Sequence, residues 1–127
     1  AHVKTMKTVL VVDPNPKSRR DVIDALPSIE LNAVEMTDGM EVLRYLKQSS
    51  VDLIISEVEL PFLGGLDFAK AVKSQHGYSR TAIVFVTSKS DPMSMIQGIK
   101  AGAKQYLTKP IQPKELSEKL SKLLGGR

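Results

Sequence analysis

The sequence predicts a single α/β domain built on a parallel β-sheet, and two observations support this fold class. First, short continuous runs of apolar and β-branched residues recur along the chain, as in strands that are covered on both faces. The clearest runs are Thr8–Val12, Leu53–Ile55 and Ala82–Val86, and weaker ones are Ala33–Met36 and Gln105–Thr108. Second, segments with helical spacing follow these runs, so strand and helix alternate five times. This alternation is typical of parallel sheets with right-handed crossovers.

Capping residues and prolines predict where the helices begin and end. Asn15 can cap the first helix, with Pro16 at the first helical position, where a missing N–H group costs nothing. Pro27 ends that helix, because proline cannot continue a helical hydrogen-bond ladder. Asp38 is the expected cap of the second helix, and Asp91–Pro92 begins the fourth.

Apolar residues spaced by three and four mark the buried side of each expected helix. Gly102 ends the fourth helix, and Pro113 begins the fifth. The marker positions, in chain order, are Val22, Ile23 and Leu26; Val42, Leu43 and Leu46; Leu66, Ala69 and Val72; Ile96 and Ile99; and Leu116, Leu120, Leu123 and Leu124.

Length and composition indicate one domain, residues 1–127, with its core between about residues 7 and 124. The 127 residues are 42% hydrophobic, which is enough for one core, and residues 125–127 are a frayed end or the start of a linker. With no cysteine, the chain has neither disulfides nor thiolate metal sites. The net charge of +4 is dispersed, without a nucleic-acid-binding motif, and no apolar run spans a membrane. We therefore expect a cytoplasmic protein that binds neither nucleic acid nor membranes.

Polar residues stand where four of the expected strands end. Asp13 follows the first strand, Glu57 follows the third, Thr87 ends the fourth, and Lys109 follows the fifth. The carboxyl ends of parallel strands meet at one edge of the sheet, which is where open α/β folds place their sites. Two carboxylates, a hydroxyl and an ammonium at one edge favour a functional site over ordinary strand ends.

These residues, with their neighbours, resemble the receiver domain of two-component response regulators, most closely the single-domain chemotaxis type. The resemblance extends from Lys7 to Leu124. It implies a flavodoxin-like, doubly wound five-stranded sheet of order 2-1-3-4-5 with five helices, acting in bacterial phosphorelay signalling. The segments that carry it are Val9–Asp13, Asp52–Glu57 with Pro61 and Gly65, Val86–Ser88, and Tyr106–Pro110.

The resemblance also implies roles for the residues at the sheet edge. In such receivers an aspartate after the third strand takes a phosphoryl group from a histidine kinase, and acidic residues after the first strand help to hold Mg²⁺. Asp13 matches one of these acidic residues, and Thr87 and Lys109 match the groups that contact phosphoryl oxygens. Tyr106 matches an aromatic residue whose rotamer changes on activation. Partner proteins would bind through the fourth helix, fifth strand and fifth helix, with Tyr106 as the central contact.

Two positions depart from the family pattern. Glu57 stands at the phosphoacceptor position, and Pro14, which has no side-chain oxygen, stands at the second acidic position. The remaining candidate metal ligands are Asp13, Glu57 and the backbone carbonyl of Glu59. We therefore expect Mg²⁺ to bind weakly or not at all, because Mg²⁺ requires a near-octahedral set of oxygen ligands. A designed phosphate mimic would need only the change at Glu57, so Pro14 favours natural divergence.

Three functions are compatible with these departures. The first is a degenerate receiver that binds a protein partner without phosphorylation, with no catalytic residue and no cofactor. The second is a working receiver that accepts a phosphoryl group despite Glu57 and Pro14. The third is a small-ligand binder, although the turn Asp13–Pro16 lacks a glycine-rich phosphate loop. Under the first hypothesis, the longer carboxylate of Glu57 reaches Lys109, and we expect an ion pair between them.

Overall fold

A computed structural model describes residues 6–27, 30–74 and 81–125, which contain a five-stranded sheet of order β2-β1-β3-β4-β5. All neighbouring strands are parallel, as the sequence predicts. The expected end of the chain lies partly outside the described residues, since 126 and 127 are not among them. The strands are β1 (Lys7–Val12), β2 (Leu31–Met36), β3 (Leu53–Ser56), β4 (Ala82–Thr87) and β5 (Gln105–Thr108).

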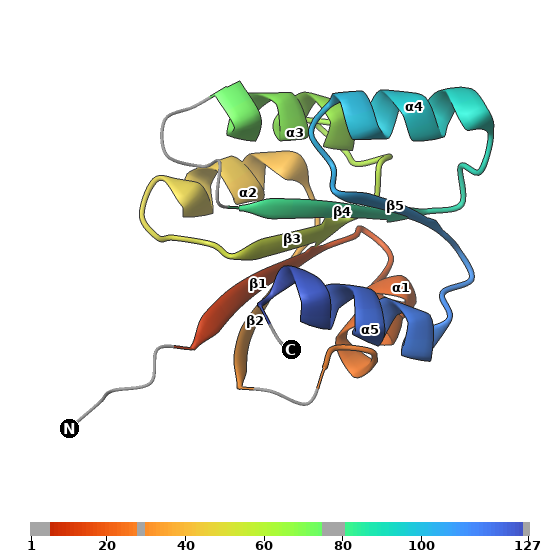
Figure 1. Cartoon of the computed structure of the whole chain (residues 1–127). Helices are drawn as coiled ribbons and strands as arrows, with labels where there is room; N and C mark the ends of the chain where they lie inside the picture. Colours follow the sequence, from red (N-terminus) through yellow and green to blue (C-terminus); the bar gives the residue numbers. More distant parts are fainter. Residues whose placement is uncertain (1–5, 28–29, 75–80, 126–127) are drawn as a thin grey trace.

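Five helices cover the two faces of the sheet, with α1 and α5 on one face and α2, α3 and α4 on the other (Figure 1). This confirms the predicted flavodoxin-like arrangement. The expected caps are present, because the side chains of Asn15, Asp38 and Asp91 accept hydrogen bonds from backbone N–H groups in the first turns that follow them. The helices are α1 (Pro16–Asp24), α2 (Gly39–Leu46), α3 (Gly65–Ser74), α4 (Pro92–Lys100) and α5 (Pro113–Leu123).

The alternation of side chains along the central strands divides the core into two clusters. Val9 and Val11 of β1 face α1 and α5, where they pack with Val22 of α1 and Leu120 of α5. Leu10, the strand residue between them, faces the opposite cluster under α2 and α3. Because β3 and β4 are buried at every position, they supply apolar side chains to both clusters. The rigid centre of the sheet therefore fixes the strand ends at which the polar residues stand.

The fourth helix differs from its predicted orientation. Ile96 and Ile99, expected on the buried side, are 50% and 49% exposed. The buried residue of α4 is Gly98, where an added Cβ would lie only 2.6 Å from the Tyr106 ring. The close contact at this glycine turns the isoleucines outward. They form, together with Met93 and Met95, an exposed surface that we call the α4 apolar patch.

Two smaller points complete the fold. The first helix ends at Asp24, with Ala25 as its C-cap, instead of continuing to Pro27. In the three described ranges, none of the helices has the length and apolar character needed to cross a lipid bilayer.

Substitutions on α4 and α5 test this assignment of exposed and buried faces. Leu120→Ala should lower the free energy of unfolding by about 2–5 kcal/mol, because Leu120 is fully buried and its loss leaves a cavity. Ile96→Ala and Ile99→Ala should each lower it by less than about 1 kcal/mol. Urea denaturation measures all three. A loss at Ile96 or Ile99 as large as that at Leu120 would contradict the outward orientation of α4.

Candidate functional site

The four polar residues predicted at the sheet edge lie together at the carboxyl ends of neighbouring strands. Backbone hydrogen bonds that continue the sheet hold three of them in place. The N–H groups of Asp13 and Glu57 donate to the carbonyls of Met36 and Val12 at 3.0 and 2.9 Å. The N–H group of Lys109 donates to the carbonyl of Thr87 at 2.8 Å. The positions of these side chains therefore follow directly from the strand order.

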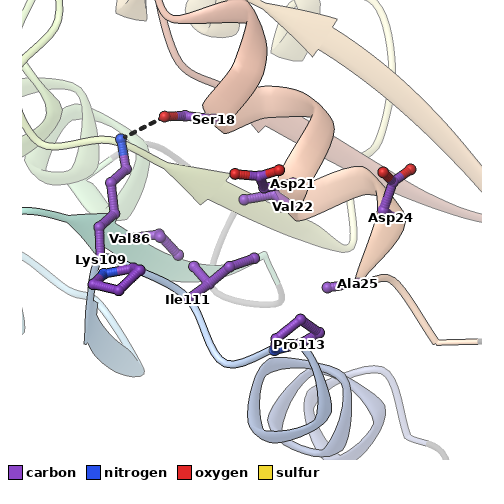
Figure 2. Close-up of a pocket in the computed structure, with 10 residues that line it drawn as sticks. Ser18, Asp21, Val22, Asp24, Ala25, Val86, Lys109, Ile111 and Pro113 are labelled. Carbon is purple, nitrogen blue, oxygen red and sulfur yellow. Dashed lines mark hydrogen bonds between the residues drawn. The ribbon is translucent and has the colours of Figure 1, made fainter.

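Lys109 is the centre of the site. Its ammonium nitrogen lies 2.9 Å from Oδ2 of Asp13 and 3.0 Å from Oε1 of Glu57. A third acceptor, Oγ of Ser18, is 3.2 Å away and comes from the first turn of α1 (Figure 2). The predicted ion pair between Glu57 and Lys109 is thus present, and it is one part of a three-way contact. Each of the three ammonium protons has one acceptor.

The second carboxylate oxygen of Glu57 turns back onto the main chain. Oε2 accepts hydrogen bonds from the N–H groups of Val58 at 2.6 Å and Glu59 at 3.3 Å. Burial raises the pKa of Glu57, but hydrogen bonds from Thr87, Lys109 and Val58 and the charge of Lys109 outweigh it. The pKa therefore lies below its ordinary value of 4.5. At neutral pH the site holds a carboxylate whose two oxygens both have donors.

The same contacts act on the lysine. Burial lowers the pKa of Lys109, but hydrogen bonds and charge from Asp13 and Glu57 outweigh burial and raise it above its ordinary value. Asp13 is 5% exposed, and its other oxygen, Oδ1, accepts a hydrogen bond from the N–H group of Asn15 at 2.8 Å. One permanent cation therefore bridges two buried anions, which is an arrangement that tolerates burial.

These residues do not fit the Mg²⁺ ion that the family resemblance implies. The Lys109 ammonium lies between the two carboxylates, and the outer oxygens of Asp13 and Glu57 accept backbone N–H bonds. Pro14 is exposed and supplies no side-chain oxygen. Among the described residues there is no cluster of three or more carboxylate, imidazole or thiolate side chains that could hold a metal. Every buried side-chain nitrogen and oxygen in those ranges already has a partner.

Hydrogen bonds connect Thr87, at the sheet edge beside Glu57, to Tyr106. The Thr87 hydroxyl, which helps to lower the pKa of Glu57, accepts from the N–H group of Lys89 at 3.3 Å. The carbonyl of Lys89 accepts from the Tyr106 hydroxyl at 2.8 Å. The Tyr106 ring is 8% exposed and packs edge-on against Phe85, with 6.2 Å between ring centroids. Tyr106 therefore points inward, beneath α4.

Three further residues contribute to the site and were not predicted from the sequence. Ser18 contacts Lys109, and Arg19 donates to the backbone carbonyl of Asp13 at 2.7 Å while its Nε bonds Glu35 at 3.0 Å. The carbonyl of Lys89 is the acceptor for Tyr106. Ser18 and Arg19 could have been found, because the first turn of a helix that follows a strand faces the same sheet edge.

Comparisons with known proteins agree on one family. Residues 9–121 match the model of the response regulator receiver domain. A chemotaxis protein CheY homolog from Campylobacter jejuni is 32% identical over 119 residues, which cover 92% of each chain. The aerobic respiration control protein ArcA of Escherichia coli is 28% identical over 117 residues, 92% of this chain. The chain spans about half the length of ArcA, since the matched part is 48% of that protein.

Solved structures lead to the same family. The structure of the chemotaxis response regulator CheY4 of Vibrio cholerae has a TM-score of 0.84 and 33% sequence identity to this chain. The match covers 94% of this chain and all of the other. The strand order, the residues at the sheet edge and the sequence matches agree, and the chain belongs to the response regulator receiver domain family.

Proposed function

We propose that this receiver domain binds a protein partner without being phosphorylated. The observation that carries the proposal is the position of the Glu57 carboxylate, with one oxygen on Lys109 and the other on backbone N–H groups. A nucleophile at this position must present a free oxygen to the phosphoryl donor. Both oxygens of Glu57 are already held by donors that lower its pKa, which weakens it as a nucleophile.

Phosphoryl transfer depends mostly on positioning and on neutralising charge, and both are altered here. The extra methylene group of Glu57 moves its carboxylate by on the order of 1 Å relative to an aspartate, and a displacement of that size can cost about 100-fold in rate. Neutralisation normally requires a metal, but Pro14 supplies no ligand and the ammonium of Lys109 lies between the carboxylates. These two obstacles favour an interaction module over a working phosphoacceptor.

A permanent charge at this position gives the domain a fixed signalling state. Glu57 bonds Lys109, and Thr87 helps to lower its pKa; these two residues match the groups that contact a phosphoryl group in the family. Glu57 therefore stands in for that group, with one carboxylate in place of several phosphate oxygens. From Thr87, hydrogen bonds continue through the backbone of Lys89 to Tyr106, which is turned inward. A ligand shifts an equilibrium only by its differential affinity for two states, and here both carboxylate oxygens at the usual attachment position are already engaged.

The α4 apolar patch is the part of the expected partner surface best suited to bind a protein. Its exposed side chains include Met93, which is 62% exposed, and the two outward isoleucines. Methionine adapts its shape to different partners. Tyr106 was expected to be the central contact, and its ring is buried against Phe85 and Gly98 in this conformation, so the exposed part of that surface is α4. We assign the contact to α4 and place Tyr106 beneath it.

Incubation with a small phosphodonor tests the proposal. With acetyl phosphate or phosphoramidate and Mg²⁺, the parent protein should show no added phosphoryl group by intact mass spectrometry. The double variant Pro14→Asp/Glu57→Asp should be modified at least about 100-fold faster than the parent, because position and metal ligand are both restored. Modification of the parent at Glu57 would show that the domain is a working phosphoacceptor.

A Mg²⁺ titration tests the assignment of Lys109 as the resident cation. Isothermal calorimetry should give an affinity for the parent at least about tenfold weaker than that of Pro14→Asp/Glu57→Asp. Removing a residue that only supports a metal ligand commonly lowers metal affinity by about tenfold or more. Glu57→Asp alone is the matched control, since it leaves Pro14 in place. Equal affinities for the parent and the double variant would contradict the assignment.

The pKa of Glu57 predicts how stability depends on pH. Because this pKa is lower in the folded protein, the carboxylate contributes stability that is present above the unfolded pKa and lost as pH falls through the folded pKa. The difference in unfolding free energy between the parent and Glu57→Gln should therefore be largest near neutral pH and shrink below about pH 4.5.

Urea denaturation from neutral pH into the acid range measures this difference. Glu59→Gln, which removes an exposed neighbouring carboxylate, controls for the change in net charge. A difference for Glu57→Gln that stays constant with pH would mean that the carboxylate does not stabilise the folded state.

A further inference from the structure

A cavity that the proposed function does not use lies beside Lys109, between α1 and the segment that joins β5 to α5. Its volume is about 740 Å³, within the range of about 300–1,000 Å³ that small-molecule sites occupy. Figure 2 shows α1 along one side, with Asp21 and Asp24, and Ile111 and Pro113 on the opposite side. No described segment of the chain fills this space.

The floor of the cavity is apolar and belongs to the rigid core. Val22, Ala25 and Val86 line it, and each is at most 4% exposed. Ile111 and Pro113 close the side opposite α1. The apolar part of a ligand bound here would be removed from water and would pack against side chains that the fold already holds in place. Binding would therefore gain hydrophobic free energy with little ordering of the protein.

Charges around the cavity select a cation. Asp21 and Asp24 lie on its α1 side. Among the described residues, their ion pairs are with Lys17 and Arg20 of the same helix, at 3.2 Å and 4.0 Å. These pairs are exposed and therefore weak, so a ligand cation can replace them. The ammonium of Lys109 cannot attract an anion in the same way, because its three protons already have three acceptors.

We propose that this cavity binds a small amphiphilic cation, with a ring or short hydrocarbon body on the apolar floor and an amine or amidinium group near Asp21 and Asp24. Binding does not depend on whether Glu57 can be phosphorylated. Ser18 and the stem of Lys109 line the same cavity and also form part of the charged contact at the sheet edge. A ligand in the cavity would therefore contact the residues of the sheet-edge site directly, and it could change the state of the domain without phosphorylation at position 57.

The volume favours a small molecule over one side chain of a partner protein, because it is several times what a single inserted side chain fills. The polar groups are also placed for a compact ligand, since both carboxylates come from one helix. A partner helix that inserts a side chain here is the alternative occupant, and the same experiment separates the two.

Amide chemical-shift titrations with three matched probes test the proposal on the whole chain. The probes are 4-phenylbutylamine, 4-phenylbutanol and 4-phenylbutyrate, which share an apolar body and differ in charge. The amine should shift the amide signals of Val22, Ala25, Ile111 and Lys109. It should bind about five- to tenfold more tightly than the butyrate, the effect expected of a near-surface charge pair.

Two variants locate the site. Asp21→Asn/Asp24→Asn should remove the preference for the amine over the alcohol and leave the alcohol bound. Glu115→Gln/Glu118→Gln, which makes the same change of charge on the exposed side of α5, should leave the preference intact. Ala25→Leu should weaken all three probes at least about tenfold by filling the floor of the cavity.

Several results would overturn the proposal. One is shifts centred on the α4 apolar patch in place of α1 and Ile111. Others are equal binding of the three probes, or no binding to the parent up to the solubility limit. If no probe binds the parent and the Ala25→Leu variant also fails to bind a protein partner that the parent binds, the cavity would be assigned to a side chain of that partner. If Ala25→Leu does not fold, the surface double variant still decides the charge preference.

Discussion

The contact on which the site depends is the ammonium of Lys109 held between the carboxylates of Asp13 and Glu57. Asp13 and Glu57 are 5% and 9% exposed, and burying two carboxylates at the edge of an apolar core is costly unless a cation pairs with them. The lysine supplies that cation from the chain itself, and Ser18 satisfies its third proton. In this family a metal normally shares the task. Here the folded chain neutralises its own acidic site.

This self-contained neutralisation explains why the two departures from the family pattern belong together. A glutamate is long enough to reach the ammonium and still return its second oxygen to the N–H group of Val58. Because position 14 holds a proline and not a second acidic residue, the site carries less negative charge. The single ammonium of Lys109 therefore balances a larger share of that charge. The proposed fixed state rests on this balance, in which the carboxylate oxygens of Asp13 and Glu57 already have partners.

The sequence was sufficient for the fold and for most of the site, because both depend on periodicity and on strand ends. Buried strands read as continuous apolar runs, and Asp13, Glu57, Thr87 and Lys109 meet because parallel strands end at one edge. The outward turn of Ile96 and Ile99 could not be predicted, since spacing identifies an apolar stripe but not what it faces. It depends on the contact between Gly98 and the Tyr106 ring, which only the three-dimensional packing reveals. The cavity beside α1 likewise has no sequence signature.

The most direct test of the account is the Tyr106 ring signal, measured by NMR in the parent and in Glu57→Ala. If the Glu57 charge sets the state through Thr87 and Lys89, its removal should shift or broaden the Tyr106 ring signals, because the Thr87 hydroxyl loses its interaction with Glu57 while it holds the Lys89 backbone that binds the Tyr106 hydroxyl. The parent should show one set of signals with an inward ring. Unchanged Tyr106 signals in Glu57→Ala would mean that Glu57 has no influence on the state of the domain, and the central claim would fail.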